Sequence, residues 1–110
     1  MAQVSMKRLV GLSGLAIGLV VSSYAYGGTS YVPPNGFVPD AATAIRVAES
    51  ILVPIYGEEK VLSERPFRAS LSGGVWTIEG TLPAGRSAGG VALVKLAKRD
   101  ARVIQVIHGK

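Results

Sequence analysis

The pattern of apolar and polar positions predicts one helix in the middle of the chain. Between Asp40 and Gly57, apolar residues recur three or four positions apart, the spacing of one helix face. Asp40 is a good N-cap, and Gly57 is typical of the position after a last turn. Pro54 should kink or end the helix and turn Ile55 and Tyr56 back onto a sheet. The expected buried face is Ala44, Ile45, Ala48, Ile51, Leu52 and Ile55.

Alternating apolar and polar residues after position 66 predict strands instead. The clearest strand places Trp76, Ile78 and Leu82 on one face and Glu79 on the other. A Gly-Gly pair at 73–74 indicates a hairpin. The four expected strands are 67–72, 75–82, 91–98 and 102–108, with a charged connector at 58–66, a flexible loop at 83–90 and a tight turn at 99–101. We therefore expect an α+β fold, in which one N-terminal helix packs on a curved, mainly antiparallel sheet of about four strands.

The apolar start of the chain has the pattern of a secretory signal peptide. Lys7 and Arg8 precede a mostly apolar run at 9–21, and small residues follow up to Ala25. Cleavage after Ala25 fits best, with cleavage after Gly27 as the alternative. An uncleaved membrane anchor is the rival reading, although a spanning helix needs roughly 20 apolar residues. We expect export to the bacterial periplasm and no stable membrane insertion after cleavage.

The segment after the expected signal is rich in Gly, Ser and Pro and should be an extended tether. The predicted organisation is a signal peptide at 1–25, a tether at 26–36 and one α+β domain at 37–110. A chain of 110 residues has room for a single domain with a modest core.

Composition excludes several classes of chemistry. The chain has no cysteine, so disulfides, thiolate metal sites and a cysteine nucleophile are excluded. The formal net charge is +5, and removing Lys7 and Arg8 leaves ten basic and seven acidic residues, or +3. That value is far from the charge typical of a nucleic-acid-binding domain. We expect no nucleic acid, no metal and no cofactor.

No recognisable catalytic set stands in the sequence. His108 is the only histidine and could act as a general base, but no orienting partner is evident, so a structural or solvent-exposed role is favoured. Trp76 could anchor an interface, yet its alternation with Ile78 favours the core. Tyr56 should cover the helix end, and the capping role explains Asp40. We therefore expect a protein that is not an enzyme.

Four residues are the candidates for contact with a partner: Glu79, Arg86, Ser87 and Lys95. Glu79 lies mid-strand on the face opposite Trp76, where it could meet a partner or pair across strands with Lys95. Arg86 and Ser87 belong to the loop 84–90, and loops on a rigid sheet often carry binding.

Five short phrases punctuate the expected elements in a characteristic order: Gly36-Phe37-Val38-Pro39-Asp40, Pro54-Ile55-Tyr56-Gly57, Trp76-Thr77-Ile78-Glu79-Gly80-Thr81-Leu82-Pro83, Gly89-Gly90-Val91 and His108-Gly109-Lys110. In this order, the segment 36–110 resembles the bacterial nuclear transport factor 2 fold immunity proteins. The resemblance implies binding of a cognate toxin, which protects the producer and its kin. Proteins of the parent fold usually have several helices before the sheet, so the single helix expected here implies a shallower, cystatin-like shape.

The export signal and the resemblance together predict an exported immunity protein that neutralises an antibacterial toxin acting in the periplasm. Steric occlusion by the open sheet face and the loop 84–90 would suffice. Two alternatives remain at this stage. One is a small pocket enzyme of the same fold superfamily, which requires Asp40, Tyr56, Glu79 or His108 to converge in a cavity. The other is a cystatin-like periplasmic inhibitor or binding module.

Overall fold

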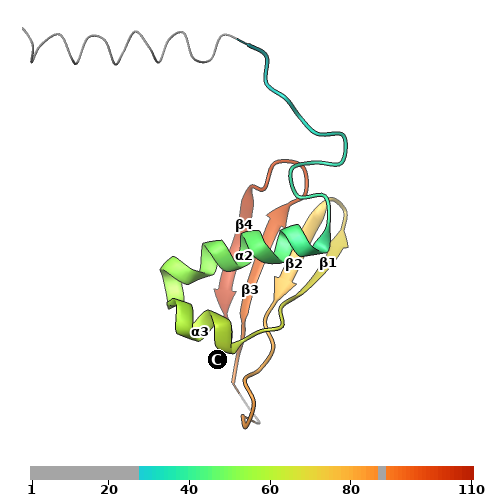
Figure 1. The fold of residues 1–110 in the computed structure, drawn as a ribbon. Helices are drawn as coiled ribbons and strands as arrows, with labels where there is room; N and C mark the ends of the chain where they lie inside the picture. The colour runs from blue at the N-terminus through green and yellow to red at the C-terminus, as the bar shows by residue number, and fades with distance from the viewer. Residues whose placement is uncertain (1–27, 87–88) are drawn as a thin grey trace, which may run out of the picture. The chain divides into compact units, whose positions relative to one another are not determined.

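The structure, a computed structural model, describes residues 28–86 and 89–110 (Figure 1). The chain divides into two units, Met1–Tyr31 and Val32–Lys110, and every described helix and strand belongs to the second. The predicted signal peptide lies outside the described residues. In the described part of the chain, no helix is long and apolar enough to cross a membrane.

The long helix α2 (Ala41–Tyr56) is the predicted one and begins at Asp40, whose Oδ1 accepts a 2.8 Å hydrogen bond from the Thr43 N–H. It continues through Pro54 to Tyr56 and ends where the Gly57 N–H bonds to Val53 O at 2.8 Å. The buried row is Ala44, Ala48 and Leu52.

The expectation that Ile55 packs on the sheet is wrong, because this side chain is 54% exposed. The buried row of α2 advances by four positions at each step, so Tyr56 and not Ile55 continues it. Tyr56 is half-buried against the core, as expected.

A second, short helix, α3 (Glu58–Ser63), occupies part of the segment expected to be a charged connector. Glu58 and Glu59 lie in its first turn, where carboxylates favour the exposed N–H groups of a helix start. Val61 is buried against the core and holds the helix in place. The charge of this segment therefore marks a helix start and not a loop.

The four strands form one antiparallel sheet in the order β1 (Arg68–Ser72), β2 (Val75–Glu79), β3 (Ala92–Ala97) and β4 (Val103–His108). Gly73 and Gly74 close the first hairpin with positive φ angles. The predicted fold class is thus confirmed. β2 stops at Glu79 and not at Leu82, because the N–H of Thr81 turns away to bond Glu64 O at 2.7 Å.

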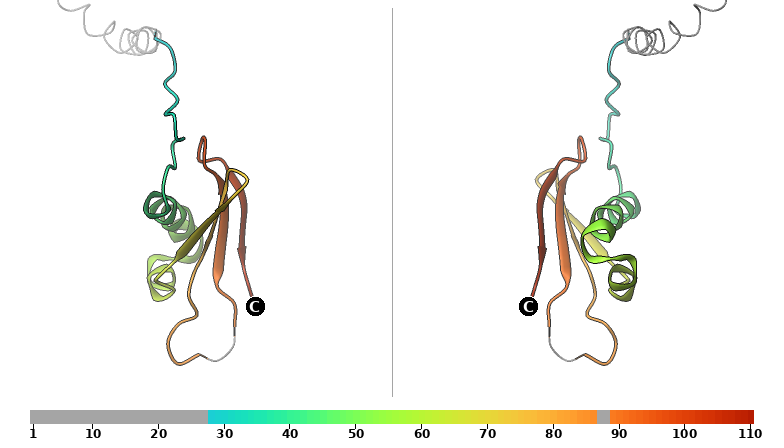
Figure 2. Two further views of the ribbon diagram at one scale, coloured as in Figure 1. Left: turned by 90° about the vertical axis from the view of Figure 1, so that its right-hand side faces the viewer. Right: turned by 90° about the vertical axis from the view of Figure 1, so that its left-hand side faces the viewer.

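Both helices lie on the same face of the sheet (Figures 1 and 2). The core fills this interface: Val38, Ala44, Ala48, Leu52, Val61, Phe67, Trp76, Ile78, Ala92, Val94 and Leu96. Trp76 is a core residue, as expected, and its indole N–H donates to Val38 O at 2.8 Å. Among the described residues, no element covers the opposite face of the sheet.

The segment that leads into α2 adds to the end of the β3–β4 hairpin. The N–H groups of Phe37 and Val38 bond Arg99 O and Lys98 O at 2.9 and 3.0 Å. Gly36 has φ 82°, and a Cβ at this position would press on Lys98 O. Glycine is therefore required where this segment meets the hairpin.

Candidate functional site

The uncovered face of the sheet carries two rows of side chains that the strand register brings together. Successive residues of a strand point alternately to the two faces of the sheet. The residues between the core residues therefore point to the uncovered face, and residues paired across neighbouring strands lie on the same face. The two rows are Arg68, Glu79, Leu93 and Ile107, and then Ser70, Thr77, Lys95 and Gln105. We call these eight residues the open face. The open face mixes charged, hydroxyl and aliphatic groups, which is the composition of a surface that is exposed to solvent in the free protein.

Glu79 and Lys95, two of the predicted contact residues, both lie on the open face. Glu79 is exposed and Lys95 is half-buried. Lys95 is opposite Thr77 and not opposite Glu79, so the two charges are diagonal neighbours on adjacent strands. No ion pair joins them in the described part of the chain. Arg68 is directly opposite Glu79 on β1, but no ion pair joins these two among the described residues either, so the charges of Glu79 and Lys95 remain available to a partner.

Arg86 lies apart from this pair, in the loop between β2 and β3. Its side chain is exposed, and its backbone N–H bonds Pro83 O at 3.2 Å in a turn. Ser87, the fourth predicted contact residue, lies outside the described residues. The contact role of all four residues stays a prediction.

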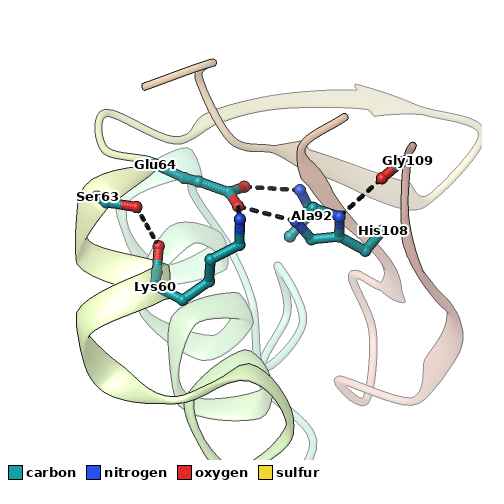
Figure 3. A network of polar contacts seen from close by, with 6 residues as sticks. All are labelled: Lys60, Ser63, Glu64, Ala92, His108 and Gly109. Atoms are coloured by element: carbon teal, nitrogen blue, oxygen red, sulfur yellow. Dashed lines mark hydrogen bonds and ion pairs between the residues drawn. The ribbon is translucent and has the colours of Figure 1, made fainter. Parts of the chain in front are cut away.

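A buried polar cluster that sequence reasoning missed lies at the other face, where α3 meets the ends of β3 and β4 (Figure 3). Its centre is Glu64, only 1% exposed. The Glu64 Oε1 accepts the Ala92 N–H at 2.7 Å, and its Oε2 lies 2.9 Å from His108 Nε2 and 3.7 Å from Lys60 Nζ. The cluster thus ties the helical layer to the sheet.

Glu64 is the orienting partner that the sequence did not reveal for His108. It lies 44 positions away in the chain, within a run of other charged residues. One signal pointed to it weakly, namely Gly80, where a Cβ would stand 2.7 Å from Glu64 Oε1. A glycine after a strand has several common causes, so this signal alone could not identify the carboxylate.

The geometry of His108 is that of a structural residue. Its Nε2 faces Glu64, its Nδ1 lies 2.8 Å from Gly109 O, and its ring packs 5.2 Å from that of Tyr56. A general base needs a free ring nitrogen directed at a substrate, and both nitrogens are occupied. The structural role favoured for His108 is therefore supported by its contacts.

The convergence that a pocket enzyme would require does not occur. Tyr56 and His108 meet, but Asp40 caps the start of α2 and Glu79 lies on the opposite face of the sheet. The Thr43 hydrogen bond lowers the pKa of Asp40, as a capping carboxylate should show. In the described segments, no group of three or more acidic or histidine side chains is placed to hold a metal ion.

The groove between α2 and α3 has a volume of about 530 Å³, and its charged lining residues are Arg46, Glu49, Glu58 and Arg65. Arg65 donates to both carboxylate oxygens of Glu49 at 2.9 Å, and this contact raises the pKa of Arg65. The ion pair shares the lining with Arg46, Ser50, Val53, Pro54, Glu58 and Leu62. Glu49 and Arg65 are thus engaged with each other, which leaves Arg46 and Glu58 as the other charged groups of the groove.

Charge is divided unequally between the two layers. Residues 40–66, the helical layer, carry five acidic and three basic residues, a net charge of −2. Residues 67–110, the sheet layer, carry two acidic and seven basic residues, a net charge of +5 with His108 counted as neutral. A partner that meets the sheet side therefore meets a basic surface.

The fold agrees with the protein class found by comparison. Residues 43–110 match the family described as NTF2 fold immunity protein. Because the match covers more than half of the chain, the chain belongs to the NTF2 fold immunity protein family, which confirms the resemblance noted from the five phrases.

The chain is also similar to the uncharacterized protein YhhH of Escherichia coli (strain K12). The two are 32% identical over 76 residues, which is 69% of this chain and 60% of that relative. The chain thus aligns with less than two thirds of the length of this relative. No solved structure matches the chain.

Proposed function

We propose that this chain is an exported immunity protein that binds a cognate antibacterial toxin and blocks it without catalysis. Membership of the immunity family supports the general role. The observation that carries the proposal is the open face, because a sheet covered by helices on one side leaves its other side free for a partner. Glu79 and Lys95 form no ion pair within the part of the chain that the structure describes, and such charges are suited to specific recognition.

Inhibition would be steric. The open face would seat against the toxin, and the loop that carries Arg86 would reach over its edge. Loops on a rigid sheet adapt to a partner at little cost to the fold. Tight binding then requires only that the toxin's working surface be covered, which explains why no catalytic group is needed.

We place this action in the periplasm because of the predicted signal peptide at 1–25. An inhibitor must meet its toxin where the toxin acts, so the toxin would attack peptidoglycan, the membrane or another periplasmic substrate. The basic sheet layer supports this choice indirectly. Basic nucleases are best opposed by acidic inhibitors, and this surface has the wrong sign for that task.

The test begins with recovery of a partner from the periplasm of the native host, using the chain expressed with its first 25 residues. The captured protein is then produced in a bacterium that lacks this chain. We expect it to stop growth, and we expect co-expression of the chain to restore growth. A captured protein that is harmless, or whose toxicity persists beside the chain, contradicts the proposal.

The contact residues are tested in the same assay by a double change, Glu79→Ala with Arg86→Ala. We expect protection to fall at least about tenfold, as for residues central to an interface. The matched control is Arg46→Ala with Glu59→Ala, which removes the same two charges from the helical layer. Unchanged protection by the first variant would reject the assigned residues while leaving the immunity role intact.

A further inference from the structure

The free edge of β4 presents unpaired backbone groups in a regular row. β4 is the last strand of the sheet and pairs only with β3 among the described elements. The Gly109 N–H bonds Val91 O at 3.1 Å, and hydrogen-bonded pairs alternate along an antiparallel ladder. Gln105 and Ile107 therefore bond toward β3. Val106 and His108 direct their backbone N–H and C=O groups outward, away from the sheet.

This edge lacks most of the features by which proteins prevent strand addition. Edge strands are commonly protected by proline, by lysine or by inward charges. Between Arg102 and Lys110, β4 has no proline, lysine, arginine or carboxylate. One irregularity, between Lys95 and Leu96 of β3, interrupts the register at the start of β4 and leaves 105–108 regular.

The side chains along β4 are also unusually apolar for an edge. Val103, Ile104 and Ile107 are 47%, 44% and 45% exposed. The opposite edge, β1, differs: α2 packs against it, and its exposed residues include Arg68, Ser70 and Ser72, with Leu71 its one exposed large aliphatic side chain. Of the two edges, β4 is the one suited to gain a strand.

Charge decides which occupant fits. Arg102 and Lys110 bracket the edge, and both are exposed, although Arg102 also lies 4.0 Å from the Asp100 carboxylate. If a second copy paired antiparallel through β4 in the register centred on Val106, Arg102 of one copy would lie opposite Lys110 of the other, and directly opposed like charges destabilise a strand pair. An extended segment with aliphatic residues in its middle and carboxylates at its ends fits both the edge and its flanks.

We propose that β4 is the strand to which the toxin adds an extended segment of its own, aliphatic in the centre and acidic at both ends. This inference rests on the proposed function and adds the chemistry of the partner to it. Main-chain hydrogen bonds to Val106 and His108 would give affinity, and contacts with Ile107 would give specificity. The added strand would extend the open face sideways.

The edge is tested without the toxin by amide hydrogen exchange, on the chain in the form that its host accumulates. The probe is a nine-residue peptide of alternating valine and threonine with two aspartates at each end. We expect it to slow exchange at the Val106 and His108 amides at least about tenfold. The same peptide with lysines in place of aspartates should leave both unchanged.

Three results in this experiment would overturn the inference. The first is no protection by the aspartate peptide. The second is equal protection by the lysine peptide, which would reject the acidic flanks. The third is protection of Val106 and His108 that needs no peptide and grows with protein concentration, which would assign the edge to a second copy of the chain.

The toxin recovered as described above provides the second arm. We expect Ile107→Thr to weaken its binding at least about tenfold, and Leu71→Thr, an equally exposed aliphatic position on β1, to change it less than about twofold. Equal effects would reject the β4 site while the immunity function stands. If no neutralised toxin is recovered, the proposed function fails, and the peptide experiment still decides whether the edge binds strands.

Discussion

At the scale of single residues, Glu64 is the charged side chain that is buried among the described residues. It is a buried carboxylate that accepts a backbone N–H and faces an imidazole and an ammonium group. Removing Glu64 would leave the buried Ala92 N–H and the largely buried His108 ring without an acceptor, which costs more than the net gain of forming the contacts. Glu64 therefore acts as a positioning residue for the ends of α3, β3 and β4.

We expect Glu64→Ala to lower the free energy of unfolding by about 3 kcal/mol, because Ala92 and His108 lose their acceptor. Glu64→Gln should lose less, since the amide oxygen still accepts the Ala92 N–H. Urea unfolding of both variants measures the difference. Glu59→Ala, which removes an exposed carboxylate from the same helix, is the control and should be near neutral. A Glu64→Ala variant as stable as this control would contradict the assigned role.

At the scale of elements, the start of α2 depends on one side chain. Asp40 accepts the Thr43 N–H, and this hydrogen bond holds the pKa of its carboxyl below the ordinary value of 3.8. A carboxyl whose folded-state pKa is depressed stabilises the fold above its unfolded pKa. That stabilisation is lost as pH falls through the lower, folded-state pKa.

We expect Asp40→Ala to be less stable than the parent at neutral pH, because α2 loses its N-cap. The difference in stability should shrink as pH falls below 3.8, because the Asp40 carboxyl of the parent protein then becomes protonated and loses its charge. The urea unfolding midpoints of both proteins, determined across this pH range, give the difference in stability. Asp40→Asn, which keeps a capping oxygen without the charge, should show a smaller and less pH-dependent difference. If the difference in stability between the parent and Asp40→Ala stays constant down to the most acidic condition, the charge of Asp40 does not contribute to capping α2.

At the scale of the whole molecule, the separation of charge between the layers governs encounter with a partner. The sheet layer carries +5 and the helical layer −2. Opposite charge on a partner raises the association rate, and salt screens this effect over about 10 Å at 0.1 M. The open face and the β4 edge both belong to the basic layer.

Binding of the captured toxin should therefore be salt-dependent mainly through its association rate. We expect that rate to fall on the order of tenfold between low salt and about 0.5 M. Arg99→Glu, at the tip of the β3–β4 hairpin, should lower it at low salt, whereas Arg46→Glu on α2 should not. Surface plasmon resonance separates the two rates. A salt-independent association rate would show that the charge asymmetry plays no part.

Much of the fold followed from local pattern. The spacing of apolar residues predicted α2 with its Asp40 cap, and alternation predicted the four strands with Trp76 and Ile78 in the core. These features depend on residues a few positions apart in the chain, so they can be predicted from the sequence. The short helix α3 was missed because a six-residue helix held by one buried side chain, Val61, leaves almost no periodicity to detect.

The candidate surface was only partly predictable. Alternation placed Glu79 opposite Trp76, but which face the helices cover is a property of packing between distant segments. The same holds for the absence of a Glu79–Lys95 pair, which depends on the strand register.

By itself, the sequence determined the class of fold, the approximate bounds of most elements, the face of β2 that packs on the core and the resemblance to the immunity family. All of these depend on residue types and short spacings. Only the tertiary structure decided that Glu64 meets His108 and that, among the described residues, one sheet face stays open and β4 is an unprotected edge. These are consequences of long-range packing and strand order, in which residues far apart in the chain become neighbours.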